Sequence, residues 1–343
     1  MVSPAPPTPR EGLVDSLGRP LGDLRVSVTD RCNFRCRYCM PRERFGKDHA
    51  FLPRAELLSF EEVARVVGIL GDTLRKVRLT GGEPLLRKDL ADLIALLTRS
   101  GAAPIALTTN GVLLPQFAEA LARAGLSRLT VSLDALDPQV FAAVTDADYS
   151  AGDVLLGIDS AAQAGFTRLK INCVVRRGLN ESEILPLARR FHGTGHVLRF
   201  IEYMDVGSTN GWRSEQVMSA AEIVALIDRE MPLEAVERAL PNDVASRYRY
   251  RDGGGEIGVI ASMTQPFCGD CSRLRLSADG QLYTCLFATS GTDLRGPLRA
   301  GASDAEIAAL LRRIWQSRAD RYSEQRQQLV MPKRKLEMSY LGG

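Results

Sequence analysis

Six of the seven cysteines in this 343-residue chain fall into two triplets, and these residues have the clearest chemistry. Cys32, Cys36 and Cys39 have the spacing C-x3-C-x2-C, and Tyr38 stands directly before the last of them. Thiolate clusters select zinc, Cu(I) or iron–sulfur centres. A structural zinc site takes four ligands, and the nearest histidine, His49, has no pairing partner. Three thiolates on an iron–sulfur cluster, which normally has four, would leave one iron open to a ligand from outside the chain.

The second triplet is Cys268, Cys271 and Cys285, spaced C-x2-C-x13-C. A zinc knuckle is the competing interpretation, but the other two histidines lie earlier in the chain and no fourth ligand is apparent. Between these cysteines, Arg273 and Arg275 share one face of an expected strand. Arginine is favoured for bidentate recognition of phosphate. The sequence therefore predicts a second metal centre with an open coordination position beside an anion site.

The composition narrows the class of protein. Hydrophobic residues make up 45% and charged residues 25% of the chain, as in ordinary globular proteins. The net charge of +3 does not favour a nucleic-acid partner, so any phosphate recognition must be local. No run approaches the roughly 18 apolar residues of a membrane span, and the N-terminus lacks the apolar core of a secretory signal. Cysteines grouped as metal ligands are typical of a reducing compartment, so we expect a cytoplasmic protein without a membrane partner.

Alternating strand and helix patterns predict the fold. Six strands are expected, each followed by a helical pattern, at residues 24–29, 77–80, 105–109, 128–133, 169–175 and 197–202. This alternation predicts an α/β fold with a parallel sheet. Six units predict a partial (β/α)6 barrel of the TIM type, since eight would close one. Three helix starts are predicted by capping boxes, at Ser59…Glu62, Asn180…Glu183 and Ser303…Glu306.

Changes in pattern along the chain predict its domains. Residues 1–20 carry five prolines and few apolar residues, so we expect a flexible N-terminal arm. Residues 21–234 would form the partial barrel. Residues 235–343 would form a C-terminal α+β extension, with antiparallel strands near 247–251 and 257–261 and a hairpin around Asp279-Gly280. The extension ends in a Gly-Gly tail.

Polar side chains interrupt the expected strands where a buried strand should be apolar. Arg25, Arg78 and Lys170 each alternate with apolar neighbours, and Thr109 and Ser132 lie at strand ends. For any one of these residues a local salt bridge is a sufficient explanation. Three cations that converge from separate strands instead favour an anionic ligand, because unpaired buried charges are costly.

A short glycine motif follows the second strand. Gly81, Gly82, Glu83 and Pro84 would by themselves be a turn, in which glycine allows close approach of the backbone and a carboxylate could receive an ammonium group. After a C-x3-C-x2-C triplet with an aromatic residue before its last cysteine, the motif resembles the radical S-adenosylmethionine (SAM) superfamily. In that superfamily the open iron chelates SAM and this motif binds its amino group.

A more specific resemblance covers residues 13–343. The two triplets, the glycine motif, the run Phe200–Met204, Arg273-x-Arg275 and the terminal Gly-Gly together resemble the GTP 3′,8-cyclase family, which opens molybdenum cofactor biosynthesis. The resemblance implies a 4Fe–4S cluster that binds SAM, held by Cys32, Cys36 and Cys39, and a second that binds substrate, held by Cys268, Cys271 and Cys285. Positions that would contact SAM are Tyr38, Gly82, Glu83, Ser132 and Met204. Positions that would contact GTP are Arg25, Arg78, Thr109, Lys170, Arg273 and Arg275.

The resemblance also implies a reaction and partners. A 5′-deoxyadenosyl radical from SAM would abstract the ribose 3′ hydrogen of GTP, and the C3′ radical would attack guanine C8. A reducing electron donor, a downstream cyclic pyranopterin monophosphate synthase and a homodimer are expected, and the Gly-Gly tail would enter the active site. Two alternatives remain open, a radical SAM enzyme with an auxiliary cluster acting on a peptide and a zinc-dependent nucleic-acid binder. The seventh cysteine, Cys173, is expected to be a small core residue.

Overall fold

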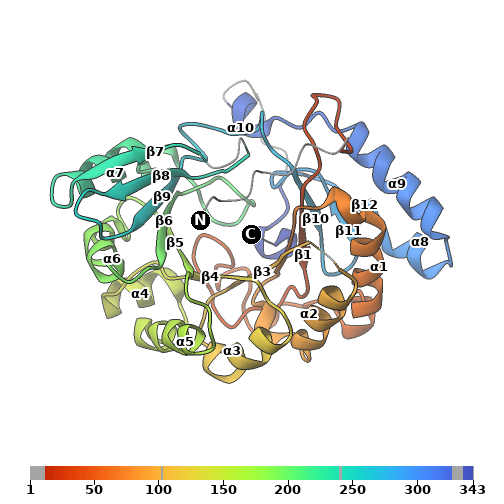
Figure 1. Ribbon diagram of the computed structural model, residues 1–343, viewed down its shortest axis with the longest axis horizontal. Helices are drawn as coiled ribbons and strands as arrows, with labels where there is room; N and C mark the ends of the chain where they lie inside the picture. Colours follow the sequence, from red (N-terminus) through yellow and green to blue (C-terminus); the bar gives the residue numbers. More distant parts are fainter. Residues whose placement is uncertain (1–11, 102, 239–241, 327–334, 343) are drawn as a thin grey trace, which may run out of the picture.

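One mixed sheet of twelve strands runs through the protein. The computed structural model describes residues 12–101, 103–238, 242–326 and 335–342. The strand order is β12-β11-β10-β1-β2-β3-β4-β5-β6-β9-β8-β7. Figure 1 shows the sheet curving into an open barrel with helices around its outside. The predicted α/β partial barrel is therefore confirmed.

The six predicted strands of the barrel all form. Their bounds are β1 Asp23–Ser27, β2 Lys76–Thr80, β3 Ile105–Thr109, β4 Arg128–Ser132, β5 Lys170–Val175 and β6 Val197–Glu202. The helices between and after them are α1 Phe60–Leu70, α2 Leu90–Arg99, α3 Leu114–Arg123, α4 Pro138–Thr145, α5 Ala151–Gln163, α6 Ile184–Phe191 and α7 Ala220–Asp228. Each strand pairs in parallel with the next, as right-handed strand–helix–strand units require.

The C-terminal extension adds strands to both edges of this barrel sheet. Its strands are β7 Leu233–Val236, β8 Ser246–Tyr250, β9 Glu256–Ile260, β10 Arg273–Leu276, β11 Gln281–Tyr283 and β12 Thr292–Asp293. The antiparallel pairs β8–β9 and β10–β11 were predicted and are confirmed. In addition β9 pairs in parallel with β6, and β10 with β1. The division predicted at residue 234 falls inside β7 and stays a prediction.

The remaining helices cover the extension and end the described chain. They are α8 Arg295–Arg299, α9 Asp304–Gln316, α10 Tyr322–Gln325 and α11 Met338–Leu341. The predicted capping boxes at Ser59 and Ser303 both form, at the starts of α1 and α9. No helix among the described residues is both long and apolar enough to span a bilayer.

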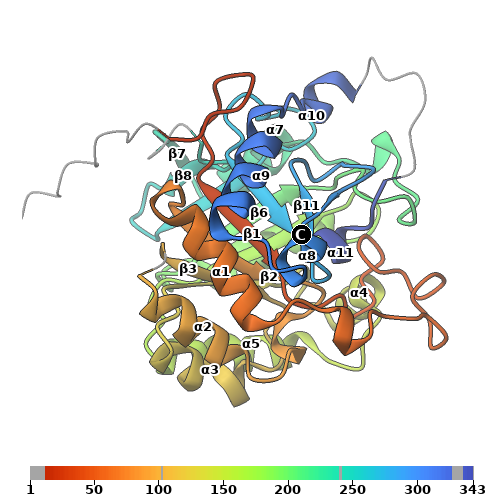
Figure 2. The same cartoon turned by 90° about the vertical axis from the view of Figure 1, so that its right-hand side faces the viewer.

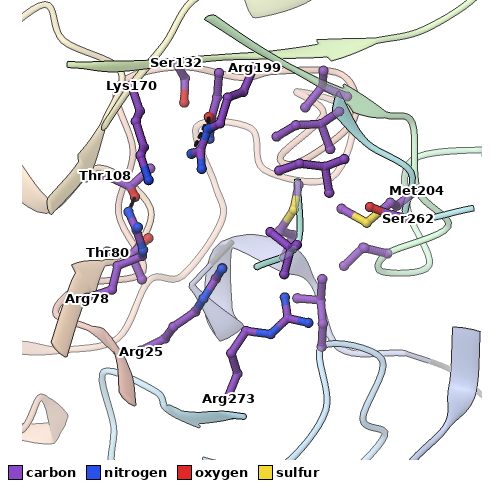
Figure 3. Close-up of a pocket in the computed structure, with 18 of the residues that line it drawn as sticks. Arg25, Arg78, Thr80, Thr108, Ser132, Lys170, Arg199, Met204, Ser262 and Arg273 are labelled. Carbon is purple, nitrogen blue, oxygen red and sulfur yellow. Dashed lines mark hydrogen bonds between the residues drawn. The ribbon is translucent and has the colours of Figure 1, made fainter. Parts of the chain in front are cut away.

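Alternation along each strand separates the core from the barrel interior. Leu24 and Val26 of β1 are fully buried and share one core cluster with Val66 of α1 and Leu93 of α2. Arg25 stands between them and faces the inside of the barrel (Figure 3). One strand therefore supplies both the packing that stabilises the barrel and a functional side chain within it.

Two local predictions were wrong. The capping box at Asn180…Glu183 does not form, since α6 starts at Ile184 after a short 3₁₀ turn. The Glu183 carboxylate instead accepts hydrogen bonds from the backbone amides of Leu136 and Asp137, at 2.6 and 3.1 Å. The Asn180 side-chain amide donates to backbone carbonyls after β4 and in β5. Both side chains therefore stabilise neighbouring loops and leave no cap for the helix.

The flexible arm predicted for residues 1–20 is wrong for its described part, residues 12–20. Val14 and Pro20 form an isolated antiparallel bridge. The Asp15 and Arg19 side chains are buried and joined by an ion pair of 2.6 Å. The proline content predicted flexibility and gave no sign of this buried ion pair. Arg19 of the pair holds the segment against the extension. Residues 1–11 lie outside the described residues.

Candidate active site

One cavity of about 890 Å³ reaches both cysteine triplets. Its lining includes all six cysteines, Cys32, Cys36, Cys39, Cys268, Cys271 and Cys285. The first three lie in the loop after β1, and the last three lie before β10 and after β11. All are free thiols. The fold therefore brings two soft donor sets, far apart in sequence, to the walls of a single space.

The glycine motif holds the first cysteine loop in place. The amide of Gly82 donates to the Thr29 carbonyl at 2.8 Å, and the amide of Glu83 donates to the Arg31 carbonyl at 2.7 Å. A Cβ on Gly82 would lie 2.3 Å from that Arg31 oxygen, so no other residue fits without moving the loop. The Gly82 backbone therefore packs closely against the cysteine loop of the same chain.

Glu83 is buried, and its carboxylate is occupied by protein donors. Oε1 accepts from the Thr109 hydroxyl at 2.7 Å and from the Leu85 amide at 3.0 Å, and Oε2 accepts from the Asn110 amide at 2.7 Å. Burial raises the pKa of Glu83 to about 7, although these donors oppose the shift. Glu83 and Thr109 both line the cavity, but the Thr109 hydroxyl is directed at Glu83.

The first cysteine triplet is buried and lies near carboxylates. Burial, reinforced by Glu83, raises the pKa of Cys32 to about 12. Burial and the Asp134 carboxylate raise the pKa of Cys36 well above its ordinary value. The Tyr38 hydroxyl donates to Asp134 Oδ2 at 2.7 Å, and burial raises the pKa of Asp134 to about 6. These thiols need a metal cation to hold them as thiolates.

The second triplet lies among arginines. Burial disfavours the Cys271 thiolate, but the charges of Arg273 and Arg318 outweigh it and lower the pKa of Cys271 to about 6. Arg273 also lies 4.9 Å from the centre of the Phe267 ring. Burial raises the pKa of Cys285 to about 11. Cys271 is therefore an anion near neutral pH even without a metal.

A group of cations lines the cavity between the triplets. Register pairing places Arg25 of β1 beside Arg78 of β2 and beside Arg275 of β10. Burial, reinforced by Arg273 and Arg78, lowers the pKa of Arg25 to about 9. Burial and neighbouring arginines lower the pKa of Lys170 to about 8. Within the described ranges, neither Arg25 nor Lys170 forms an ion pair. Like charges this close are destabilising unless an anion lies between them.

Figure 3 shows the predicted Arg25, Arg78, Lys170 and Arg273 side chains directed into this common space. Ser132 lies at the far end of the same space, and Met204 on its opposite side (Figure 3). Tyr38 and Gly82 also line the cavity. The fold therefore assembles residues that the sequence placed on separate strands.

Sequence reasoning missed Arg199 in β6. Its guanidinium donates to Asn172 Oδ1 from Nε and Nη2, at 2.9 and 2.6 Å, and burial lowers its pKa to about 10. Two further residues of this space were also missed, Thr108 and Ser262. The Thr108 hydroxyl accepts a hydrogen bond from Arg78 Nη1 at 2.6 Å. The signal for Arg199 was available, because it interrupts the apolar run Val197–Ile201 as Arg25 interrupts β1.

Arg275 has a different environment from the other predicted cations. Its Nη1 donates to the carbonyls of Gly342 and Leu341, at 2.5 and 3.4 Å. Gly342 is buried, and a Cβ there would lie 2.5 Å from the Thr80 side chain. The C-terminal segment thus ends inside the barrel, as Figure 1 shows from the end and Figure 2 from the side. Gly343 lies outside the described residues.

Cys173 lies apart from both triplets. It is fully buried in β5 and belongs to the hydrophobic core, as predicted. Within the described ranges, no three His, Cys, Asp or Glu side chains are arranged to ligate one single metal ion. Each triplet offers three soft thiols, a donor set that fits an iron–sulfur cluster with one open iron.

Known proteins match the chain over nearly its full length. The radical SAM superfamily matches residues 26–191, and the family described as Molybdenum Cofactor Synthesis C matches residues 196–324. A GTP 3′,8-cyclase of Acidothermus cellulolyticus is 52% identical, with 96% of this chain and 98% of the relative covered. One from Staphylococcus aureus is 43% identical, with 97% and 99% covered.

A solved structure supports the fold. Streptococcus suis SuiB bound to S-adenosylmethionine superposes with a TM-score of 0.56 at 13% identity, covering 84% of this chain and 67% of SuiB. Membership of the radical SAM superfamily means that this enzyme uses SAM together with an iron–sulfur cluster. On the sequence matches, the chain belongs to the GTP 3′,8-cyclase family, radical SAM enzymes of molybdenum cofactor biosynthesis.

Proposed function

We propose that this enzyme converts GTP into (8S)-3′,8-cyclo-7,8-dihydroguanosine 5′-triphosphate. The relatives that share 43–52% identity are named for this activity. The observation that carries the proposal is the single cavity that joins two cysteine triplets across a group of buried cations. A triphosphate is an anion of suitable charge for that group, and arginine forks suit its oxygens.

The first triplet and its surroundings form the SAM end of the site. Cys32, Cys36 and Cys39 would hold a 4Fe–4S cluster, which with SAM supplies the 5′-deoxyadenosyl radical. The other residues of this end would contact SAM: Tyr38, Gly82, Glu83, Ser132 and Met204. Because the Glu83 carboxylate is already occupied by Thr109, Leu85 and Asn110, we assign its main role to shaping the turn.

The cations and the second triplet form the GTP end. Arg25, Arg78, Lys170 and Arg273 would bind phosphate oxygens, and Arg199 joins them. Thr109 and Arg275 would act at the edge of this group, since their polar atoms contact Glu83 and the C-terminal tail. Cys268, Cys271 and Cys285 would hold a second 4Fe–4S cluster that receives the guanine ring. The protein's part is to fix ribose C3′ near SAM and to exclude water.

The overall balance needs an external reductant. One electron cleaves SAM to methionine and the radical, which takes the ribose 3′ hydrogen before C3′ bonds to guanine C8. A second electron and a proton complete the dihydro product. We therefore propose a reducing electron donor as one partner, a cyclic pyranopterin monophosphate synthase that consumes the product as another, and a homodimeric enzyme with the barrel and extension divided near residue 234.

Anaerobic turnover with SAM, a reductant and GTP tests the proposal. We expect 5′-deoxyadenosine and a cyclised nucleotide to form in equal amounts, and deoxyadenosine to depend on GTP. Deoxyadenosine formed equally well without GTP would contradict the substrate. A peptide that replaces GTP in this assay would establish the alternative of a peptide-modifying enzyme.

A further inference from the structure

The segment before β1 contacts the backbone of the second cysteine triplet. Arg19 Nη1 donates to the Cys268 carbonyl at 2.8 Å and to the Asp320 carbonyl at 2.8 Å. Arg318, which follows α9, donates from Nη1 to the Cys271 carbonyl at 2.6 Å. In Figure 1 the red N-terminal segment runs close to the C-terminal end of the blue helix α9. Two guanidinium groups therefore hold two of the three cysteine residues.

Asp15 links these two arginines. Its Oδ2 accepts from Arg19 Nε at 2.6 Å and lies 3.4 Å from Arg318 Nη1, while its Oδ1 accepts from the amides of Leu17 and Arg19. All three side chains are almost fully buried. The Trp315 ring packs against Arg318 with a centre distance of 4.6 Å, and its Nε1 donates to the Arg19 carbonyl. The triad is therefore a fixed part of the fold.

The triad carries more positive than negative charge. Two guanidinium groups share the one Asp15 carboxylate, and outside the triad Asp320 forms an ion pair with Arg318, with Oδ2 3.7 Å from Nε. Arg19 Nη2 and Arg318 Nε are buried and have no hydrogen-bond partner among the described residues. Both arginines contact the cysteine backbone, Arg19 at Cys268 and Arg318 at Cys271, and Arg318 also lines the cavity. The guanidinium groups, rather than the carboxylates, donate hydrogen bonds to the cysteine carbonyls, and positive charge this close to a metal centre acts on it through space.

We propose that Asp15, Arg19 and Arg318 form a positioning triad that fixes the backbone of Cys268 and Cys271 and raises the reduction potential of the second cluster. The inference rests on the proposed function, since it needs that cluster. Reduction adds an electron, so nearby positive charge stabilises the reduced form. None of the three side chains is required to contact substrate, which separates the triad from the cations that would bind GTP.

The test uses the full chain with Cys32, Cys36 and Cys39 all replaced by alanine, so that only the second triplet can hold iron. We expect about four iron atoms per chain after anaerobic reconstitution. The midpoint potential, followed by electron paramagnetic resonance, should shift to more negative values in Arg19→Gln and Arg318→Gln. It should shift to more positive values in Asp15→Asn. Arg318→Lys keeps the charge and should restore most of the potential.

Arg65→Gln is the matched control, because Arg65 forms an ion pair with Asp304 on the surface. It should leave the potential unchanged. Folded variants with unchanged iron content and potential would overturn the triad while leaving the second cluster in place. A background variant that binds no iron would instead reject the second cluster itself. If the glutamine variants fail to fold, Asp15→Asn and Arg318→Lys still test the proposal. A triad with a purely structural role predicts no shift of the midpoint potential to more positive values in Asp15→Asn.

Discussion

The two cysteine triplets offer the same donor set to one cavity, but their electrostatic surroundings have opposite sign. Glu83 and Asp134 lie near the first triplet and help to raise the pKa values of Cys32 and Cys36. Arginines surround the second and lower the pKa of Cys271 to about 6. Negative surroundings favour the oxidised form of a cluster and positive surroundings the reduced form. On the proposed function, the first cluster would therefore be suited to giving up an electron and the second to binding an electron-rich ligand.

Cysteine replacements test this division of roles and should have the largest effect. Cys39→Ala should abolish 5′-deoxyadenosine formation, because SAM would lose its cluster. Cys271→Ala should keep the iron of the first triplet and SAM binding, but lose the cyclised nucleotide together with the GTP-dependent deoxyadenosine. Both products are measured by chromatography after anaerobic turnover, with iron content as a second readout. Cys173→Ala, in the hydrophobic core, is the control and should keep the full iron content. Loss of SAM binding in Cys271→Ala, as in Cys39→Ala, would mean that the two centres are not separable.

The C-terminal tail joins the two halves and should show the next largest effect. Gly342 has a φ of +71° and no room for a Cβ beside Thr80. Removal of the last two residues, or Gly342→Val, should leave iron content and SAM binding intact and abolish the cyclised product. Replacement of Gly68 by alanine is the control, because Gly68 lies in α1 with open space around it and without a positive φ. Unchanged turnover in the shortened chain would show that the tail has no part in the reaction.

Loss of a single cation from the GTP half should have a smaller effect. Charge-assisted hydrogen bonds contribute about 1.5–3 kcal/mol, which corresponds to about ten- to a hundredfold in Kd. We expect Arg78→Gln and Arg199→Gln each to weaken GTP binding by that factor without weakening SAM binding. Equilibrium binding to the reconstituted enzyme measures both affinities. A parallel loss of SAM affinity would contradict the separation of the two halves. Arg65→Gln again serves as the surface control.

Sequence patterns were informative where spacing alone determines chemistry. The triplets and the strand alternation around Arg25 and Lys170 could be interpreted because a cysteine spacing or a period of two is local. The parallel pairing of β10 with β1 and of β9 with β6 could not be predicted from the sequence, since it depends on how distant segments meet. The hydrogen bonds of the Glu83 carboxylate were missed for the same reason, because its partners, Thr109 and Asn110, lie at the end of another strand, β3. The buried ion pair of Asp15 was missed because the proline content of residues 1–20, four of whose five prolines precede residue 10, was applied to the whole segment.

Deprotonation of Lys170 provides the mildest test of the comparison, because it removes a positive charge from the basic half without a substitution. Burial and its arginine neighbours lower the pKa of Lys170 to about 8 in the free enzyme, and a bound triphosphate would raise it again. GTP affinity should therefore be full below that pKa and should fall as pH rises through about 8. Lys170→Met should bind GTP more weakly and lose this component of the pH dependence, which isolates it from the titration of GTP itself. On the acidic half, burial raises the pKa of Asp134 to about 6 and that of Glu83 to about 7, so above about pH 8 both carboxyl groups are ionised and SAM affinity should not fall with GTP affinity. Identical pH profiles for GTP binding in the wild type and in Lys170→Met would show that Lys170 does not meet the anion.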